Sequence, residues 1–308
     1  MRRILAAVVL GTAFLVVGDA MAQASPGNAN ASSQAPPRSP GKVFDVDGRP
    51  MHLFCTGTGG PLVVIIAGVG GRLEDWRTVQ NATSAFTRTC YYDRAGYGWS
   101  ASTAPHRSFD ARTEDLRKLL AAAGEAGPYV LVGHSYGGIL ARRFVALHPS
   151  KVAGVVLVES VEELEMSDPR ILAEEASADQ RYSQDEEQII RSHPEMADGL
   201  RRFFDTLRDE EWSVIHIPEA MRTAGAFGRL GDRPLVVISR GLPSTPRNEG
   251  ADAAWTDAQA RLTHLSTDVR QVVADKSGHN VQVEQPQVIV QAVHDVVEKV
   301  RARYRRPS

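Results

Sequence analysis

The sequence lacks the residues and spacings on which several classes of protein depend. Only two of its 308 residues are cysteines, too few for a disulfide-built scaffold or a zinc site of four thiolates. It contains no His-x-x-x-His or Cys-x-x-Cys spacing, so common metal-ligand patterns are absent. The 35 basic side chains do not outnumber the 37 acidic ones, which leaves no basic excess for nucleic-acid phosphates. We therefore expect neither a metal centre nor a nucleic-acid partner.

The overall composition is that of a globular protein. Apolar residues make up 43% of the chain and charged residues 23%, close to the average of soluble domains. This balance excludes a disordered, collagen-like or coiled-coil chain. The length allows one large domain or two ordinary ones.

The first 22 residues have the three-part plan of a secretory signal peptide. A basic start is followed by an apolar run over 4–17 and by a small-x-small cleavage site over 20–22. The run is shorter than the ~20 residues that span a bilayer, which favours cleavage near Gln23 over an uncleaved anchor. The sequence thus predicts a periplasmic or secreted protein without a membrane span. Residues 23–41, rich in small and polar types, are expected to form a flexible linker.

From residue 42 onward, strand-like apolar runs alternate with helical periodicity. Runs such as PLVVIIA over 61–67 are continuously apolar, as in a parallel strand that is buried on both faces. The sequence therefore predicts one α/β domain over 42–308, with a mostly parallel sheet and helices on both faces. Strands are expected at 42–47, 50–56, 61–67, 89–92, 129–133, 152–158, 235–239 and 270–274, and helices near 76–86 and at 109–123, 137–147 and 286–304.

Residues 160–231 interrupt this alternation. They show helical periodicity without a strand. Between Ser160 and Asp198 there are twelve acidic and three basic residues, a net charge of −9. Solvated helix faces explain this charge simply, and a negative rim that repels anionic substrates is the alternative. Either way, the segment is expected to form a helical cap over a cleft.

The clearest chemical motif is Gly133-His134-Ser135-Tyr136-Gly137, which has the G-x-S-x-G pattern. It follows a predicted buried strand and precedes a predicted helix. A side chain at either glycine would collide in so sharp a turn, and the turn raises the serine hydroxyl above the sheet. The positive end of the helix points at that hydroxyl. This context favours Ser135 as a nucleophile over a glycine-rich turn without chemistry.

A serine nucleophile needs a base, and His279 is the best candidate. It lies in Ser277-Gly278-His279-Asn280, between the last predicted strand and the last helix, so that the nucleophile precedes the histidine in the chain. The other histidines considered lie in strands, in helices, in the serine turn itself or outside strand-end loops: His52, His134, His148, His216, His264 and His294.

A third motif completes a resemblance to the α/β-hydrolase superfamily over about 43–304. Asp93–Ser100 reads DRAGYGWS and resembles the D-x-x-G-x-G-x-S loop after the fourth strand of these enzymes. The resemblance implies the α/β-hydrolase fold but no particular substrate, because this fold hosts many reactions. It also makes Trp76, Tyr97 and Trp99 candidates for lining an acyl pocket, with simple packing as the alternative.

The same resemblance implies an oxyanion hole built from the backbone N–H groups of Val69 and Tyr136. The family usually has His-Gly where this chain has Ala67-Gly68, a tolerable difference because the donor is a backbone group. The glycines over 68–71 lack the G-x-G-x-x-G spacing, and no Lys-Ser/Thr follows them, so they do not indicate a phosphate cradle. No cofactor is expected.

The sequence leaves more than one candidate for the acid that would complete a triad with Ser135 and His279. No carboxylate directly follows the seventh predicted strand, where most family members carry one. The sixth strand and its end resemble the segment with which haloalkane dehalogenases can supply the acid, which implies Glu159, with Asp252 or Glu249 as alternatives. Its role would be to orient the histidine and stabilise its positive charge. Dehalogenation itself is excluded, because it needs an Asp in place of Ser135.

The two cysteines, Cys55 and Cys90, are free to pair in an oxidising compartment, and two buried thiols are the alternative. In the superfamily the second and fourth strands are neighbours, and the cysteines lie in these two predicted strands. The resemblance therefore implies a disulfide between them.

Together these features predict an exported serine hydrolase that cleaves a carboxylic ester-type bond in a small molecule through an acyl-enzyme. An amidase or peptidase of the same fold is the first alternative. A non-catalytic binding protein of this fold is the second. The sequence does not indicate the oligomeric state or the acyl and alcohol specificity.

Overall fold

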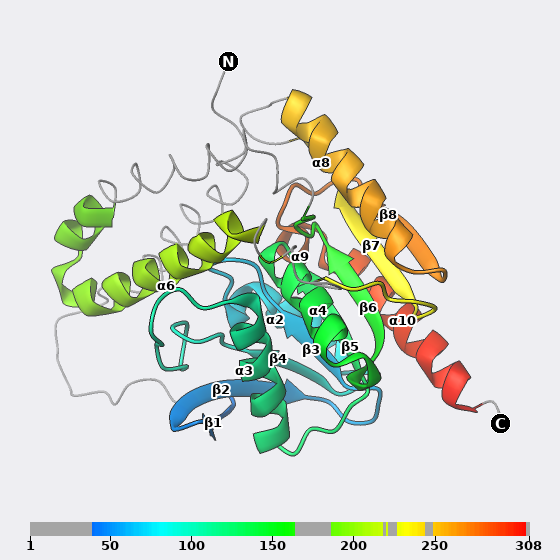
Figure 1. The fold of residues 1–308 in the computed structure, drawn as a ribbon, viewed down its shortest axis with the longest axis horizontal. Helices are drawn as coiled ribbons and strands as arrows, with labels where there is room; N and C mark the ends of the chain where they lie inside the picture. The colour runs from blue at the N-terminus through cyan, green and yellow to red at the C-terminus, as the bar shows by residue number, and fades with distance from the viewer. Residues whose placement is uncertain (1–38, 164–185, 218–219, 221–226, 244–248, 306–308) are drawn as a thin grey trace.

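The centre of the protein is one eight-stranded sheet with the order β1-β2-β4-β3-β5-β6-β7-β8 (Figure 1). The computed structural model describes residues 39–163, 186–217, 220, 227–243 and 249–305. The two pairings of β2, with β1 and β4, are antiparallel and the other pairings are parallel, which confirms the predicted α/β-hydrolase fold. The strands are β1 (Lys42–Val46), β2 (Arg49–Thr56), β3 (Val63–Ile66), β4 (Thr89–Tyr92), β5 (Tyr129–His134), β6 (Val152–Val158), β7 (Leu235–Arg240) and β8 (Val269–Ala274).

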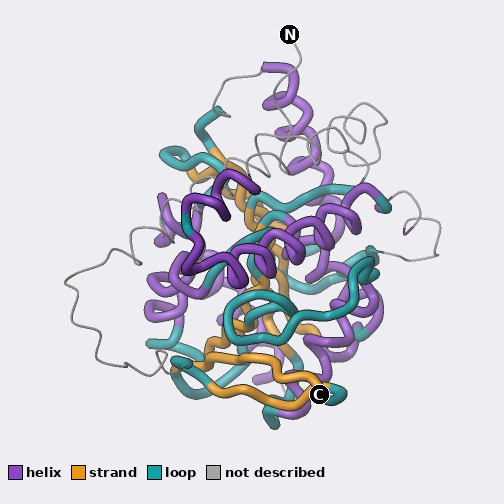
Figure 2. The backbone as a smooth tube through the Cα atoms, turned by 90° about the vertical axis from the view of Figure 1, so that its left-hand side faces the viewer, coloured by secondary structure: helices purple, strands orange, loops and turns teal. Residues whose placement is uncertain are grey.

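Helices cover both faces of the sheet, as the apolar strands require, and Figure 2 shows the strands as a band with helices on either side. Alternate residues of β3 point to opposite faces. Val63 and Ile65 pack into one core, with α2 (Leu73–Thr83), α9 (Val281–Glu284) and α10 (Pro286–Arg305). Val64 and Ile66 pack into the other, with α3 (Phe109–Ala122), α4 (Tyr136–Leu147) and α8 (Glu249–Leu262).

Helix α8 was not among the predicted elements. Its buried side chains Ala251, Trp255, Ala258 and Leu262 recur every three or four residues, which is the helical signal. The first turn of α8 carries both Glu249 and Asp252.

The predicted cap lies between β6 and β7. Its described part contains α6 (Ala197–Ile215), which buries Leu200, Phe204, Leu207 and Val214, and the short helix η2 (Pro194–Met196). Much of the acidic stretch, residues 164–185, falls outside the described residues, as do the signal-like segment and most of the predicted linker. Among the described residues, no helix is both long and apolar enough to cross a membrane.

The two cysteines lie opposite each other on β2 and β4. Their sulfur atoms are 1.99 Å apart, so the structure joins Cys55 and Cys90 across two neighbouring strands. Their sequence separation is 35 residues, and closing a loop of that length stabilises the folded chain by about 4 kcal/mol in the chain-entropy model.

Candidate active site

Ser135 occupies the turn between β5 and α4 in a strained backbone conformation, with φ 51° and ψ −121°. A non-glycine residue pays for such a conformation, and it persists where the surroundings enforce it. A Cβ on Gly133 would come within 2.6 Å of the carbonyl oxygen of Gly137, and a Cβ on Gly137 within 2.0 Å of the carbonyl oxygen of Ile66. Both glycines are therefore required for the turn, as the motif predicts.

The surroundings of Ser135 hold this turn in place. Its backbone N–H donates to the carbonyl of Val158 at 3.0 Å. Its own carbonyl accepts from the N–H of Gly138 at 3.0 Å and from that of Val161 at 3.2 Å. The residue is 5% exposed and directly precedes the first turn of α4, whose positive end favours a developing negative charge.

Glu159 and His279 meet at the carboxyl ends of β6 and β8. The Nδ1 atom of His279 lies 3.3 Å from Oε2 of Glu159. Glu159 is fully buried with a φ of 45°, and its Oε1 accepts the backbone N–H of Arg240 at 2.7 Å. With the proton on Nδ1 donated to the carboxylate, the other imidazole nitrogen is left as a base.

Asp252, one of the two alternative acids, contacts Arg240. Asp252 accepts a hydrogen bond from Nη2 of Arg240 at 2.9 Å, and Nη1 of the same guanidinium lies 3.3 Å from Glu159. The guanidinium also lies over the ring of Trp255, at 5.4 Å from its centroid. The structure thus brings Glu159 to His279 and Asp252 to Arg240. The contribution of Arg240 had no sequence signal, because it depends on where β7 and α8 meet.

His134, which sequence reasoning set aside as part of the serine turn, contacts the histidine loop. Its Nε2 atom lies 2.9 Å from the carbonyl oxygen of His279, and the two rings are 4.8 Å apart. Burial, together with the nearby charge of His279, lowers the pKa of His134 to about 3. The neutral ring therefore donates from Nε2 to that carbonyl and anchors the loop beside Ser135.

The buried His134 predicts a loss of stability in acid. Its pKa is about 3 in the folded chain against an ordinary 6.5, so the unfolded state binds the proton first as the pH falls. Stability should decrease from about pH 6.5 downward, by about 5 kcal/mol if the whole shift is expressed. His134→Gln, which keeps an N–H donor, should flatten this dependence.

Urea denaturation between about pH 4 and about pH 7 measures this effect. The exposed His294 offers a matched control, because His294→Gln should leave the pH dependence of the wild type. An equal slope in wild type and His134→Gln would contradict the prediction.

The loop after β3, residues 67–71, passes directly beside the serine turn. A Cβ on Gly68 would meet Cβ of Ser135 at 3.1 Å and Nδ1 of His134 at 2.9 Å, so only glycine fits there. The N–H of Gly71 closes the loop on the carbonyl of Gly68 at 3.1 Å. Within the described part of the chain, no protein acceptor takes the backbone N–H of Val69 or of Tyr136. The predicted oxyanion hole requires that both groups lack such an acceptor.

A cavity of 380 Å³ starts at the end of this loop and extends below the cap. Tyr97 and Trp99 line it, whereas Trp76 is fully buried in the core, where its ring and that of His134 form a T-shaped pair. Trp76 therefore acts in packing, the alternative raised from the sequence. The apolar wall of the cavity consists of Leu73, Tyr97, Trp99, Met196, Leu200 and Phe203.

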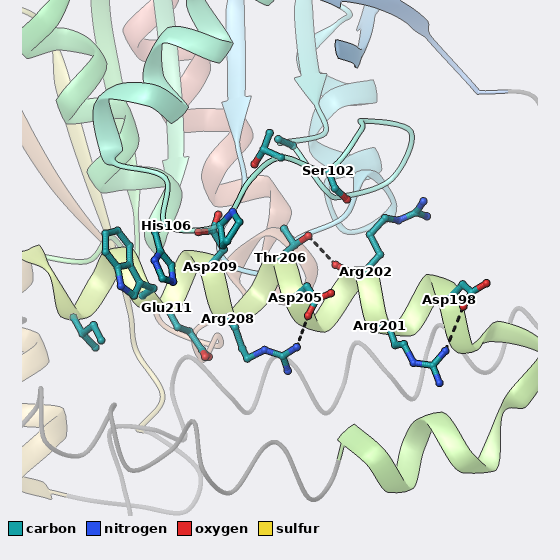
Figure 3. Close-up of a pocket in the computed structure, with 15 residues that line it drawn as sticks. Ser102, His106, Asp198, Arg201, Arg202, Asp205, Thr206, Arg208, Asp209 and Glu211 are labelled. Atoms are coloured by element: carbon teal, nitrogen blue, oxygen red, sulfur yellow. Dashed lines mark hydrogen bonds and ion pairs between the residues drawn. The ribbon is translucent and has the colours of Figure 1, made fainter. Parts of the chain in front are cut away.

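A larger cavity of 810 Å³ lies between α6 and the loop over 95–106, and Figure 3 shows its charged lining. Arg201 pairs with Asp198 at 3.3 Å, and Arg208 pairs with Asp205. None of the three triad candidates is among the described lining residues of either cavity. The 380 Å³ cavity differs from the larger one in that it is lined by Gly71, the last residue of the loop beside the serine turn.

Comparison with known proteins agrees with the observed fold. The model of the Alpha/beta hydrolase family matches residues 63–292. An uncharacterised protein of Bacillus subtilis is 26% identical over 259 residues, covering 83% of this chain and 91% of its own. An esterase of Mycobacterium tuberculosis is 27% identical over 263 residues, covering 79% and 84%. The structure of an esterase from Thermogutta terrifontis, 19% identical, superposes with a TM-score of 0.64 over 84% of this chain and 98% of its own.

Proposed function

The chain belongs to the alpha/beta hydrolase family, and on that basis we propose that it is an exported serine hydrolase that cleaves a carboxylic ester-type bond. The observation that carries the proposal is the contact between His279 and the buried Glu159. The backbone of His279 also binds the side chain of His134, which directly precedes Ser135 in the strained strand-to-helix turn. A binding protein would need neither the strain nor the buried carboxylate.

In the proposed reaction, Ser135 transfers its hydroxyl proton to Nε2 of His279 as its oxygen attacks the ester carbonyl carbon. The backbone N–H groups of Val69 and Tyr136 bind the resulting oxyanion, each donor contributing about 10²–10³ in rate. The imidazolium returns the proton to the departing alcohol, which leaves an acyl-enzyme. Water then attacks the acyl carbon while His279 takes its proton. The bond from the acyl carbon to the Ser135 oxygen breaks, His279 returns the proton to that oxygen, and the acid product leaves.

Glu159 supports both halves of this cycle. Its carboxylate accepts from Nδ1 of His279, so it holds the imidazole in one tautomer and stabilises the positive charge that the ring acquires. The backbone N–H of Arg240 fixes the carboxylate from the other side. The positive φ of Glu159 is the second strained backbone position at this edge of the sheet, as expected where residues are aimed for function.

The substrate we propose is a small ester with an apolar group. The support is the 380 Å³ cavity, which is lined by Gly71 at the end of the loop over 67–71 and by the following Arg72, and has a mainly apolar wall. The named esterases among the relatives and structural neighbours agree with ester chemistry. Export is supported by the signal-like first 22 residues, and the N-terminal sequence of the purified mature chain tests it.

Two measurements on the wild-type protein test the proposal. Turnover of p-nitrophenyl esters of rising acyl length should exceed turnover of the matching p-nitroanilides, and a fluorophosphonate probe should label the peptide that contains Ser135. A preference for anilides would indicate the amidase alternative. A protein that neither turns over esters nor reacts with the probe would be a binding module.

A further inference from the structure

Arg94 lies buried behind the oxyanion loop, residues 67–71, and binds it from the carbonyl side. Its Nη1 donates to the carbonyl oxygen of Ala67 at 2.5 Å, and its Nη2 donates to that of Gly68 at 2.7 Å. The residue is 5% exposed. The Gly68 carbonyl and the Val69 N–H belong to one planar peptide unit. A guanidinium that fixes the carbonyl therefore also fixes the direction of the N–H group proposed to bind the oxyanion.

The charge of Arg94 adds to this geometric effect. Hydrogen bonds from a charged donor are shorter and stronger than neutral ones. A bond to the carbonyl of a peptide also polarises the unit and strengthens its N–H as a donor. Arg94 thus acts on Val69 through the intervening peptide, without touching the substrate.

The cap helix α6 supplies the partner that holds Arg94. Glu210, fully buried on α6, accepts from Nε of Arg94 at 2.5 Å and from Nη2 at 2.9 Å. Its Oε2 also accepts from the hydroxyl of Tyr97 at 3.0 Å, and that hydroxyl accepts the N–H of Gly70 at 3.2 Å. Glu210 therefore reaches the oxyanion loop by two bridges, through Arg94 and through Tyr97.

The second proposed oxyanion residue is tied to the same helix. The hydroxyl of Tyr136 lies 2.8 Å from the hydroxyl oxygen of Ser213 on α6, and Ser213 donates to the carbonyl of Glu210 at 2.6 Å. Burial raises the pKa of Tyr136 to about 12, so its hydroxyl keeps its proton and donates to Ser213. The guanidinium of Arg94 lies 5.5 Å from the centre of the Tyr136 ring.

Close packing brings α6 to this position. Gly96, two residues beyond Arg94, has a φ of 91°, and a Cβ there would meet the side-chain oxygen of Thr206 at 2.1 Å. The loop over 93–100 is thus pressed against the cap helix. In Figure 1, α6 lies outside the sheet and its flanking helices, so its contact with the oxyanion loop depends on how the cap is docked.

We propose that Arg94 and Glu210 are positioning residues that make the geometry of the oxyanion hole depend on docking of the cap helix α6. The inference rests on the proposed serine hydrolase function. When α6 is docked, the buried Glu210 carboxylate holds the guanidinium group of Arg94, and this group orients the Gly68–Val69 peptide. When α6 is displaced, Arg94 loses its partner and the Val69 N–H loses its fixed direction.

The test compares catalysis with stability in variants of full-length protein. Arg94→Lys keeps the charge but cannot bind both loop carbonyls and Glu210 in one plane. We expect kcat for a p-nitrophenyl ester to fall by about 10²–10³, the worth of one oxyanion donor, while KM changes less than about threefold. Inhibition by a trifluoromethyl ketone, whose adduct with the serine carries an oxyanion, should weaken by a similar factor.

Glu210→Gln is the second variant, because it keeps the volume and removes the charge that holds Arg94. It should lower kcat and ketone affinity together, by about tenfold or more, again with little change in KM. If Arg94→Lys does not fold, this variant carries the test.

Arg142→Lys is the matched control. Arg142 is equally buried and pairs with Glu163 at 2.6 Å, but it lies on α4 and binds no atom of the oxyanion loop among the described residues. Its melting temperature should fall as in the test variants, and its kcat should stay at the wild-type value. The proposal is overturned if Arg94→Lys and Glu210→Gln lose stability with kcat and ketone affinity unchanged. If the wild type lacks ester turnover and probe labelling, the proposed function itself has failed.

Discussion

Ser135→Ala is expected to lower kcat for p-nitrophenyl esters by about 10⁴–10⁶ and to abolish labelling by the fluorophosphonate probe. The alanine variant has no oxygen to form the acyl-enzyme, so only direct attack by water in the remaining oxyanion hole is left. Its fold should be unchanged, because the backbone hydrogen bonds of Ser135 with Val158, Gly138 and Val161 do not involve the side chain. Steady-state kinetics and a melting curve measure the two expectations together.

A neighbouring serine provides the control for this experiment. Ser160 is fully buried near the serine turn, and its hydroxyl donates to the carbonyl of Val161 at 3.1 Å. Ser160→Ala removes a hydroxyl from the same region but should keep turnover within about tenfold of the wild type and remain labelled. Residual activity of more than about one per cent in Ser135→Ala would show that another group performs the attack.

Glu159→Gln is expected to give the second largest effect, a fall in kcat of about 10²–10⁴. The amide oxygen can still accept the backbone N–H of Arg240, so the strand end should keep its structure. The amide NH₂ group then faces Nδ1 of His279, donates where the carboxylate accepted, and favours the tautomer with its proton on Nε2. That tautomer cannot accept the proton of Ser135.

Asp252→Asn is the matched control for the acid. Asp252 contacts the same Arg240 guanidinium from the other side, so its loss disturbs the local charge balance without removing a partner of His279. Its kcat should stay within about tenfold of the wild type. If Asp252→Asn lost as much activity as Glu159→Gln, the two carboxylates would have exchanged roles. The kcat ratio of the two variants is therefore the decisive measurement.

The fold was predictable from the sequence to the extent that its signals are local. Strands such as β3 and β6 are buried on both faces and read as continuous apolar runs, so their existence did not depend on knowing their neighbours. The helix expected at 109–123 is present as α3, and the side chain of Ser108 accepts from the N–H of Ala111 at its start. Helix α8 was not predicted, because two of the four apolar side chains that it buries are alanines, which mark an apolar helix face only weakly.

The residues of the candidate site also differ in whether a local sequence signal indicates them. Ser135 and His279 were singled out from short motifs, since a strand-to-helix turn and a strand-end loop impose their geometry within a few residues. The acid remained a choice among three carboxylates, because the sequence does not say which one reaches a histidine 120 residues away. In the structure, Arg240 contacts both Asp252 and Glu159, and Glu159 also lies against the imidazole.

The sequence by itself determined the alternation of strands and helices, the family resemblance and the serine turn, because each depends on residues that are near neighbours in the chain. Only the tertiary structure decided which carboxylate faces His279 and that the cap helix reaches the oxyanion loop. Arg94 and Glu210 are 116 residues apart, and nothing in either local pattern indicates the other. Their pairing exists because packing of the cap removes both charges from water together, and a buried charge is tolerated only beside its partner.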